Sequence, residues 1–319
     1  MGLSEQLAGF LRSLRPTYWV HNLIHYKRLK ANRQLYKQTG INKPVWYSLK
    51  HADIKRTLNE KPWLDEPDAV TKMQQSTVWN NFSATIQQQL LQWPEAGFVI
   101  LKNYFTADET DAVNNSIDSL LQTQKADLAS SGRKIMNAWR QSKPCEHLFR
   151  QKQLLEILSF LLGRQVVPFQ TINFIYGSEQ RAHSDSVHMT TEPLGYLIAT
   201  WTALEDAHEG SGLLEYYPGS HKLPYVMSED YQTNNTLWSL GADNYPNYEK
   251  KIASVIQQNR LQPVQFKAQK GDVLIWHANL LHGGVPITQK QLTRKSQVAH
   301  YFGKGVLCYH EVSQRPALL

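Results

Sequence analysis

Apolar residues in the second half of the chain fall into short runs that turn residues separate. The β-prone runs are Val166 to Tyr176, Leu197 to Leu204, Leu213 to Tyr217, Val264 to Lys267, Val273 to Trp276 and Gln297 to Phe302. Short runs bounded by Gly, Pro and Asn are typical of strands. Because helical patterns precede them, we predict a mainly β (α+β) protein, an antiparallel barrel or jelly roll that helices decorate on one side.

The first half of the chain carries helix signals. Thr106 and Glu109 have capping-box spacing, which predicts a helix from there to about Gln122. Other predicted elements are a helical stretch over Val78–Gln92, a short β run over Phe98–Leu101 and a helix over Gln153–Leu162 that Gly163 ends. We therefore divide the chain into a basic, helical and irregular extension over residues 1–75 and a jelly-roll domain over residues 76–319.

Composition fits one main domain with a charged arm. Of the 319 residues 41% are hydrophobic, and the formal net charge is +7. Residues 1–40 contain seven Lys or Arg and one Glu, so six of the seven net charges belong to the arm. Cys145 and Cys308 form no pairing pattern, and no apolar run is long enough to span a membrane. We expect a cytoplasmic protein, at most peripheral to a membrane.

The arm has two interpretations. Residues 10–37 mix cations with apolar and aromatic side chains, a composition suited to an interfacial helix on anionic lipid. Alternatively the arm is a helical extension that packs its apolar side on the core, and we favour this version because Pro16 interrupts the pattern. No nucleic-acid motif accompanies the charge, and no obligate protein partner is expected.

Candidate chemistry lies in a divided set of polar residues. His183 and Asp185 lie two residues apart, His282 follows ninety-nine residues after His183, and Arg294 comes twelve residues later. Two imidazoles and one carboxylate are the facial triad of non-haem Fe(II) oxygenases, and an arginine beyond them suits the far carboxylate of 2-oxoglutarate. On a strand His183 and Asp185 would point to one face and Ser184 to the other.

Other histidines compete for the ligand positions. The competitors are His188, His208, His221, His277 and His300. His277 is the serious one, but it is farther from Arg294 and lacks the glycines, Gly283 and Gly284, that follow His282. On a strand, the odd spacing between Asp185 and His188 would turn His188 away from the ion.

Four ordered blocks of sequence resemble a known family. The blocks are GSEQRAHSDSVHM, GSGLLEYYPGSHK, GDVLIWHANLLHGGVPI and TRKSQVAHY. They are similar to the phytanoyl-CoA dioxygenase family of Fe(II)/2-oxoglutarate oxygenases, over roughly residues 90 to 305. The resemblance implies a double-stranded β-helix (jelly roll) in which His183, Asp185 and His282 bind iron and Arg294 binds the 5-carboxylate of 2-oxoglutarate.

The resemblance also carries weaker assignments and two departures. Trp201 matches an aromatic position near 2-oxoglutarate, and Asn173 matches a residue that reaches its 1-carboxylate. Ser184 stands where many members have Gln, which affects substrate placement. Gly284 stands where many members have a serine, which removes a hydrogen bond to the co-substrate.

The implied activity is a dioxygenase reaction with Fe(II), 2-oxoglutarate and O2. It would hydroxylate a C–H bond of a small-molecule or lipid-linked substrate and release succinate and CO2, and the carboxylate of Asp185 favours oxidation over halogenation. The alternative is a non-catalytic metal-binding jelly roll, docked on a membrane through its arm.

Two segments carry open predictions about the substrate. The stretch 223–262 is either a lid over the substrate or surface packing. A basic cluster either meets a phosphate or carboxylate of the substrate or is a solvated face; it comprises Lys134, Arg140, Lys143, Arg150 and Lys152.

Overall fold

A six-stranded antiparallel sheet forms the centre of the computed structural model, which describes residue 11 and residues 13–58, 60–126, 128 and 133–318. In spatial order its strands are β1 (Phe98–Leu101), β8 (Val273–His277), β5 (Leu197–Ala203), β10 (Ser296–Gly303), β3 (Val166–Phe174) and β2 (Lys134–Met136). Two three-stranded sheets accompany it: β7 (Val264–Phe266), β6 (Leu214–Tyr216) and β9 (His282–Gly284), and β12 (Arg315–Pro316), β11 (Leu307–His310) and β4 (Thr190–Glu192). The predicted mainly β architecture is confirmed.

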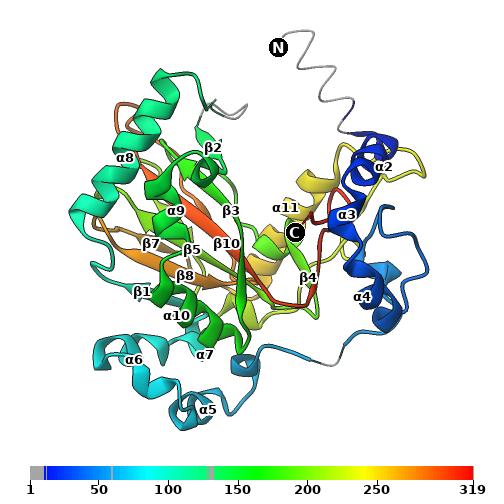
Figure 1. Ribbon diagram of the computed structural model, residues 1–319, viewed down its shortest axis with the longest axis horizontal. Helices are drawn as coiled ribbons and strands as arrows, with labels where there is room; N and C mark the ends of the chain where they lie inside the picture. The colour runs from blue at the N-terminus through cyan, green and yellow to red at the C-terminus, as the bar shows by residue number, and fades with distance from the viewer. Residues whose placement is uncertain (1–10, 12, 59, 127, 129–132, 319) are drawn as a thin grey trace.

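Helices cover one face of the large sheet (Figure 1). They are α5 (Ala69–Gln75), α6 (Ala84–Leu90), α7 (Trp93–Ala96), α8 (Ala107–Gln122), α9 (Lys143–Phe149) and α10 (Lys152–Leu162). The predicted capping box begins α8: the Thr106 hydroxyl accepts from the Glu109 amide at 3.2 Å, and the Glu109 carboxylate accepts from the Thr106 amide at 2.9 Å. Gly163 ends α10 in the left-handed region at φ 64°, as predicted.

Strand alternation divides β10 between two environments. Ala299 and Tyr301 point into the apolar core beneath the helices. Val298, His300 and Phe302 point to the other face, where they line a cavity. Because successive side chains alternate across a sheet, one strand supplies both the core and the cavity wall. The cavity therefore lies on the face opposite α8, α9 and α10.

The N-terminal extension packs on the C-terminal strands. Its helices are α2 (Arg15–Ile24), α3 (Tyr26–Leu29) and α4 (Asn32–Thr39), which Figure 1 places beside the C-terminus. Leu29 and Tyr36 share a buried apolar cluster with Leu307 and Tyr309. This is the packed arrangement that we favoured for the arm. Phe10 and Arg12 of the proposed interfacial segment lie outside the described residues, and a domain boundary at residue 75 stays a prediction.

The sequence pattern did not predict five short strands, β2, β4, β9, β11 and β12. Each has four residues or fewer, so hydrophobic alternation has little length over which to appear. Helix α11 (Asn244–Gln258) lies within the stretch 223–262. Across the described residues, no helix is both long and apolar enough to cross a bilayer.

Candidate metal centre

Three buried side chains converge at one end of the cavity. One ligand atom from each of His183, Asp185 and His282 lies within 4.8 Å of the other two, so the three could hold a metal ion. The backbone brings the histidines together, because His183 and His282 exchange amide-to-carbonyl hydrogen bonds of 2.9 and 3.0 Å. Asp185 is not on a strand: it begins a 3-10 turn over Asp185–Val187, so the predicted strand spacing was wrong.

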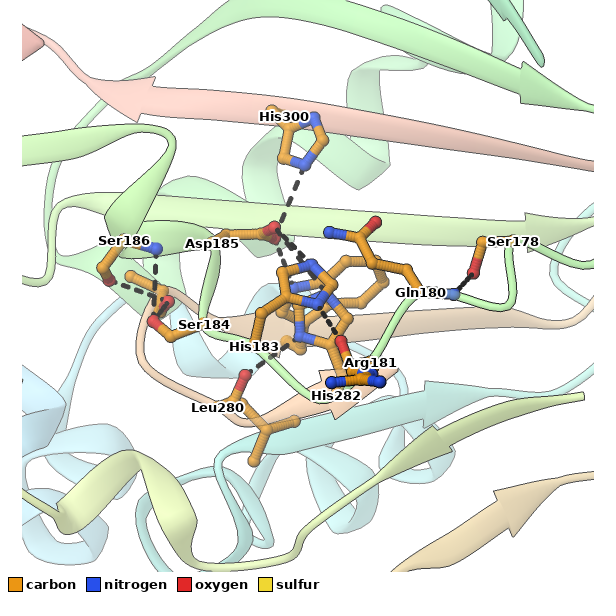
Figure 2. A network of polar contacts seen from close by, with 12 residues as sticks. Ser178, Gln180, Arg181, His183, Ser184, Asp185, Ser186, Leu280, His282 and His300 are labelled. Atoms are coloured by element: carbon orange, nitrogen blue, oxygen red, sulfur yellow. Dashed lines mark hydrogen bonds and ion pairs between the residues drawn. The ribbon is translucent and has the colours of Figure 1, made fainter. Parts of the chain in front are cut away.

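Backbone carbonyls orient both imidazoles. The Nδ1 atom of His183 lies 2.9 Å from the carbonyl oxygen of Arg181, and Nδ1 of His282 lies 3.0 Å from that of Leu280 (Figure 2). A carbonyl only accepts, so Nδ1 carries a proton in each ring, and Nε2 is the nitrogen that can coordinate a metal. Each Nε2 faces Oδ1 of Asp185, at 3.9 Å from His183 and 3.7 Å from His282.

The other carboxylate oxygen of Asp185, Oδ2, contacts two side chains of the large sheet. Its Oδ2 accepts a hydrogen bond from the indole Nε1 of Trp276 at 2.8 Å, and His300 Nε2 lies 3.4 Å away. Trp276 comes from β8 and His300 from β10, so the large sheet fixes the rotamer of a side chain that lies outside it. The sequence suggested His300 only as a competing ligand, and nothing in the sequence pointed to Trp276.

The protonation states suit metal binding. Burial, with His282 nearby, lowers the pKa of His183 to about 4, so its imidazole is neutral at pH 7. Burial alone would raise the pKa of Asp185, but the neighbouring His282 and His300 lower it well below its usual range. Neutral imidazoles and an ionised carboxylate are the forms that coordinate a metal.

Arg294 enters the same cavity as an unpaired buried cation. Its side chain is 2% exposed, and among the described residues its Nε and Nη1 have no hydrogen-bond partner. The guanidinium lies over the rings of Phe174 and Trp201, at 5.6 and 5.4 Å from their centroids. Burial lowers the pKa of Arg294 to about 10, with partial compensation by Glu205, so the group remains cationic near neutrality. A planar cation with free donors fits a carboxylate.

The cavity has a volume of about 650 Å³ and is the pocket in which the predicted residues meet. Trp201 lines it, and the indole Nε1 has no partner among the described residues. The expectation for Asn173 is corrected. Its amide donates to Gln297 at 3.1 Å, whereas the adjacent Ile172 and Phe174 line the cavity. Strand alternation on β3 therefore turns Asn173 to the helix-covered face.

The competing histidines differ in whether they line the cavity. His277 lies 3.3 Å from Asp65 and does not line the cavity, and His221 lies 3.3 Å from the carbonyl of Pro94. His208 is exposed. His188 does line the cavity, at 5.8 Å between its ring centroid and that of His183. The expectation that His188 turns away was wrong, because the 3-10 turn replaces the strand on which that expectation depended.

Both departures from the family pattern have local structural counterparts. The Ser184 hydroxyl donates to the Ala278 carbonyl at 2.9 Å, so it points away from the cavity as the sequence predicted. A Cβ at Gly284 would lie 2.5 Å from the hydroxyl oxygen of Ser178, which itself lines the cavity. Ser178 therefore occupies the space that a side chain at position 284 needs.

Helix α11 supports the segment that carries His183 and Asp185. The Tyr248 hydroxyl accepts from the Ser184 amide at 2.9 Å, and Tyr248 is fully buried. Tyr245, on the same helix, accepts from the Gln180 amide group at 2.9 Å and lines the cavity. Both tyrosines lie in the stretch 223–262, for which the sequence left a lid and surface packing open.

The sequence matches a known family. Residues 93–296 match the sequence model of a family described as phytanoyl-CoA dioxygenase (PhyH). The peroxisomal phytanoyl-CoA dioxygenase of Bos taurus is 24% identical over 233 residues, which cover 66% of this chain and 66% of the bovine protein. The chain thus spans just under two thirds of that relative.

Solved structures agree on the fold. SnoK, a non-heme alpha ketoglutarate dependent carbocyclase from nogalamycin biosynthesis, has a TM-score of 0.56 at 18% identity and covers 74% of this chain and 90% of its own. EctD from S. alaskensis, crystallised with 2-oxoglutarate and 5-hydroxyectoine, has a TM-score of 0.53 at 20% identity and covers 70% of this chain and 76% of its own. At these identities the likeness shows the fold alone, and it confirms the predicted jelly-roll core.

Proposed function

The chain belongs to the phytanoyl-CoA dioxygenase family, and from this premise we propose that it is a non-haem Fe(II)/2-oxoglutarate-dependent dioxygenase that hydroxylates a C–H bond of a small-molecule or lipid-linked substrate. One observation carries the proposal: His183, Asp185 and His282 converge in the cavity that also receives the unpaired guanidinium of Arg294. EctD, which shares the fold, was crystallised with 2-oxoglutarate, and this supports the same co-substrate here.

Each residue has a defined task. His183, Asp185 and His282 would hold Fe(II), as the 2-His-1-carboxylate set that leaves positions open for other ligands. Trp276 and His300 lie beside Oδ2 of Asp185 and restrain the carboxylate, which leaves Oδ1 as the oxygen that faces both histidines. When bound, iron with 2-oxoglutarate and O2 supplies the oxidising chemistry, converting 2-oxoglutarate to succinate and CO2 as one oxygen atom enters the substrate.

Arg294 anchors the co-substrate. Its free Nε and Nη1 donors form the fork that pairs with a carboxylate through two parallel hydrogen bonds. The indole of Trp201 lies beside this guanidinium and limits where the chain of 2-oxoglutarate can run. Burial of both side chains excludes water from the pairing and strengthens it. Asn173 has no role here, since it faces the opposite side of the sheet.

Succinate formation by the anaerobically iron-loaded protein, started with O2, tests the proposal. Wild-type protein should form succinate from 2-oxoglutarate, with or without substrate, and Asp185→Ala should abolish it. Arg294→Ala should remove 2-oxoglutarate binding, whereas Arg56→Ala, an exposed arginine of the extension, should leave it intact. Absence of turnover across a broad substrate panel, together with unchanged 2-oxoglutarate binding in Arg294→Ala, would instead indicate the non-catalytic metal-binding jelly roll.

We also propose peripheral contact with anionic membranes, because the packed extension still presents apolar side chains to solvent. Ile24 is 73% exposed and Trp238, on a loop beside α2, is 61% exposed. Exposed cations follow directly in the sequence, at Lys27, Arg28 and Lys30. Exposed apolar groups beside cations are typical of binding to the surface of anionic lipid.

Vesicle sedimentation at low salt tests this contact. Wild-type protein should bind phosphatidylglycerol-containing vesicles more strongly than pure phosphatidylcholine, and Ile24→Glu should weaken that binding. Val70→Glu is the matched control, because Val70 is 43% exposed but lies on α5, in the layer that covers the other side of the sheet. Equal binding of wild type and Ile24→Glu would exclude this surface.

We further propose that residues 223–262 form a lid over the substrate. Tyr245 in this segment lines the cavity and bonds to Gln180, which lies three residues before His183. Tyr245→Ala should change the selectivity among substrates while 2-oxoglutarate affinity stays constant. Unchanged selectivity would instead indicate that the segment only packs on the surface.

A further inference from the structure

The cavity contains two cations beyond Arg294. Lys134 comes from the edge strand β2, where it is the register partner of Phe174 on β3. Phe174 lines the cavity, and Lys134 lies on the same face, with its ammonium 6.0 Å from the ring centroid. Arg315 comes from β12 at the other end of the chain, and it also lines the cavity. The sequence placed Lys134 in a basic cluster, and of that cluster only Lys134 lines this cavity.

Among residues 133–318, no carboxylate forms an ion pair with either cation. Burial lowers the pKa of Lys134, and no neighbouring carboxylate offsets the effect. The guanidinium of Arg315 donates from Nε to the hydroxyl of Ser313 at 3.0 Å and lies over the ring of Tyr18 at 4.8 Å, both neutral partners. Among the described residues that line the cavity, Asp185 is the single acidic one. A half-buried cation without a counter-charge costs stability unless a ligand compensates it.

The charges of the metal, the co-substrate and their binding residues balance without Lys134 and Arg315. A divalent ion, the Asp185 carboxylate, dianionic 2-oxoglutarate and the Arg294 cation sum to zero. The charges of Lys134 and Arg315 then remain, and the part of the cavity wall that the structure describes contains no further acidic side chain to balance them. The substrate is the one component of the reaction that is still to be placed.

Two histidines join the cations into one polar region. His188 and His310 both line the cavity, and their ring centroids lie 5.3 Å apart. Burial and the neighbouring Arg315 lower the pKa of His310 to about 3, so its ring is an uncharged hydrogen-bonding group at neutral pH. We call Lys134, His188, His310 and Arg315 the cationic end of the cavity.

The rest of the wall is largely apolar. Its apolar members include Met136, Phe169, Ile172, Met189, Val298 and Phe302. We propose that the substrate is an amphiphilic anion, with a carboxylate or phosphate that binds at the cationic end and an apolar body that lies along this wall. This inference rests on the proposed dioxygenase function and adds the substrate class to it.

The N-terminal extension takes part in this recognition. Tyr18 of α2 stacks on Arg315, and His21 and Asn22 of the same helix line the cavity. The family match begins only at residue 93. The extension therefore contributes a wall that belongs to this chain rather than to the matched region, and it helps to hold Arg315 in place.

Calorimetric titration of protein loaded with Mn(II), which replaces Fe(II) without turnover, and saturating 2-oxoglutarate tests the inference. The probes are octanoate, octyl phosphate and octan-1-ol, which share one apolar chain. We expect the tighter anion to bind at least about tenfold more strongly than the alcohol, as a charge-assisted hydrogen bond provides. Comparison of octanoate with octyl phosphate identifies which anionic group fits.

Variants locate the preference. Lys134→Met and Arg315→Met should each reduce the preference for the anion about tenfold and leave the affinity for octan-1-ol unchanged. Lys143→Met is the control, because Lys143 is 92% exposed on α9. Neither anion binding better than octan-1-ol, or a preference that survives in the double variant, would overturn the inference.

A separate measurement distinguishes failure of the underlying function. Before the probes are added, 2-oxoglutarate is titrated into each Mn(II) protein. Its affinity should be equal in wild type, Lys134→Met and Arg315→Met, because Arg294 and the metal triad are unchanged. If wild type does not bind 2-oxoglutarate, the proposed function fails; if it does and the anions show no preference, only the substrate assignment fails.

Discussion

Replacing Arg294 with methionine should abolish 2-oxoglutarate binding without lowering the stability of the protein. Methionine keeps the apolar stem and similar volume but removes the guanidinium, which is 2% exposed and has no carboxylate partner among the described residues. We expect the variant to lose 2-oxoglutarate binding while its metal-free form unfolds at the same temperature as wild type or at a higher one. Lysine at this position keeps the charge but loses the fork of donors.

The magnitudes follow from burial. Removing one partner of a buried, hydrogen-bonded ion pair costs about 2–5 kcal/mol, which weakens 2-oxoglutarate binding by a factor of about 30 to several thousand. Burial lowers the pKa of Arg294 from about 12.5 to about 10. Keeping the guanidinium charged in the unliganded protein therefore costs about 3 kcal/mol of folding free energy. Stacking on Phe174 and Trp201 returns up to about 2 kcal/mol of this.

Two measurements check the prediction. Calorimetry on the Mn(II) protein gives the 2-oxoglutarate affinity of wild type, Arg294→Met and Arg294→Lys. Differential scanning calorimetry of the metal-free protein gives the melting temperature, where a gain of about 1 kcal/mol raises the midpoint by about 2 °C in a protein of this size. A methionine variant that melts more than a few degrees below wild type would refute the argument, because the guanidinium would then stabilise the fold rather than await a ligand.

Three further predictions concern the support of the site. Trp276→Phe removes the donor to Asp185 and should weaken metal binding about 10- to 100-fold in an anaerobic Fe(II) titration, whereas an unchanged affinity would show that Asp185 needs no such restraint. Tyr248→Phe leaves the buried amide of Ser184 without its acceptor, so the free energy of unfolding in urea should fall by about 1–3 kcal/mol; an equal midpoint contradicts this. Burial lowers the pKa of His310 to about 3 in the folded protein, whereas in the unfolded chain it has the usual value of about 6.5. Between these two pH values the unfolded chain binds a proton at His310 and the folded protein does not. The contribution of neutral His310 to the free energy of unfolding is therefore complete above about pH 6.5 and falls by about 1.4 kcal/mol per pH unit as the pH drops toward 3. Between pH 7.5 and 5, the free energy of unfolding of His310→Gln should fall by about 2 kcal/mol less than that of wild type.

Local sequence signals predicted the long elements well. The capping box at Thr106 and the glycine at position 163 fixed the ends of two helices, because caps depend on residues a few positions apart. Strands β3, β5 and β10 are long enough for apolar runs to show in the sequence. Of the two- and three-residue strands, β6 and β7 lie within predicted runs, whereas β2, β4, β9 and β12 were missed. Strand β4, for example, pairs with β11, which lies far away in the chain.

The chemical set could also be read before the fold. Two histidines, an aspartate and an arginine in a fixed order, within four sequence blocks, pointed to the family that residues 93–296 match. The expectation for Asn173 failed because a family position does not reveal which face of β3 the side chain takes. That choice is set by the register of β3 with β10, where Asn173 pairs with Gln297.

By itself, the sequence determined the residue types: which side chains can coordinate a metal, which can grip a carboxylate and where helices begin and end. Only the tertiary structure decided how these groups are held and what else joins them. Trp276 and His300 meet Asp185 because the sheet aligns β8, β5 and β10, and Lys134 reaches the cavity of Arg315 across 181 residues of chain. Such contacts depend on strand order and register, which long-range packing selects and short-range periodicity does not encode.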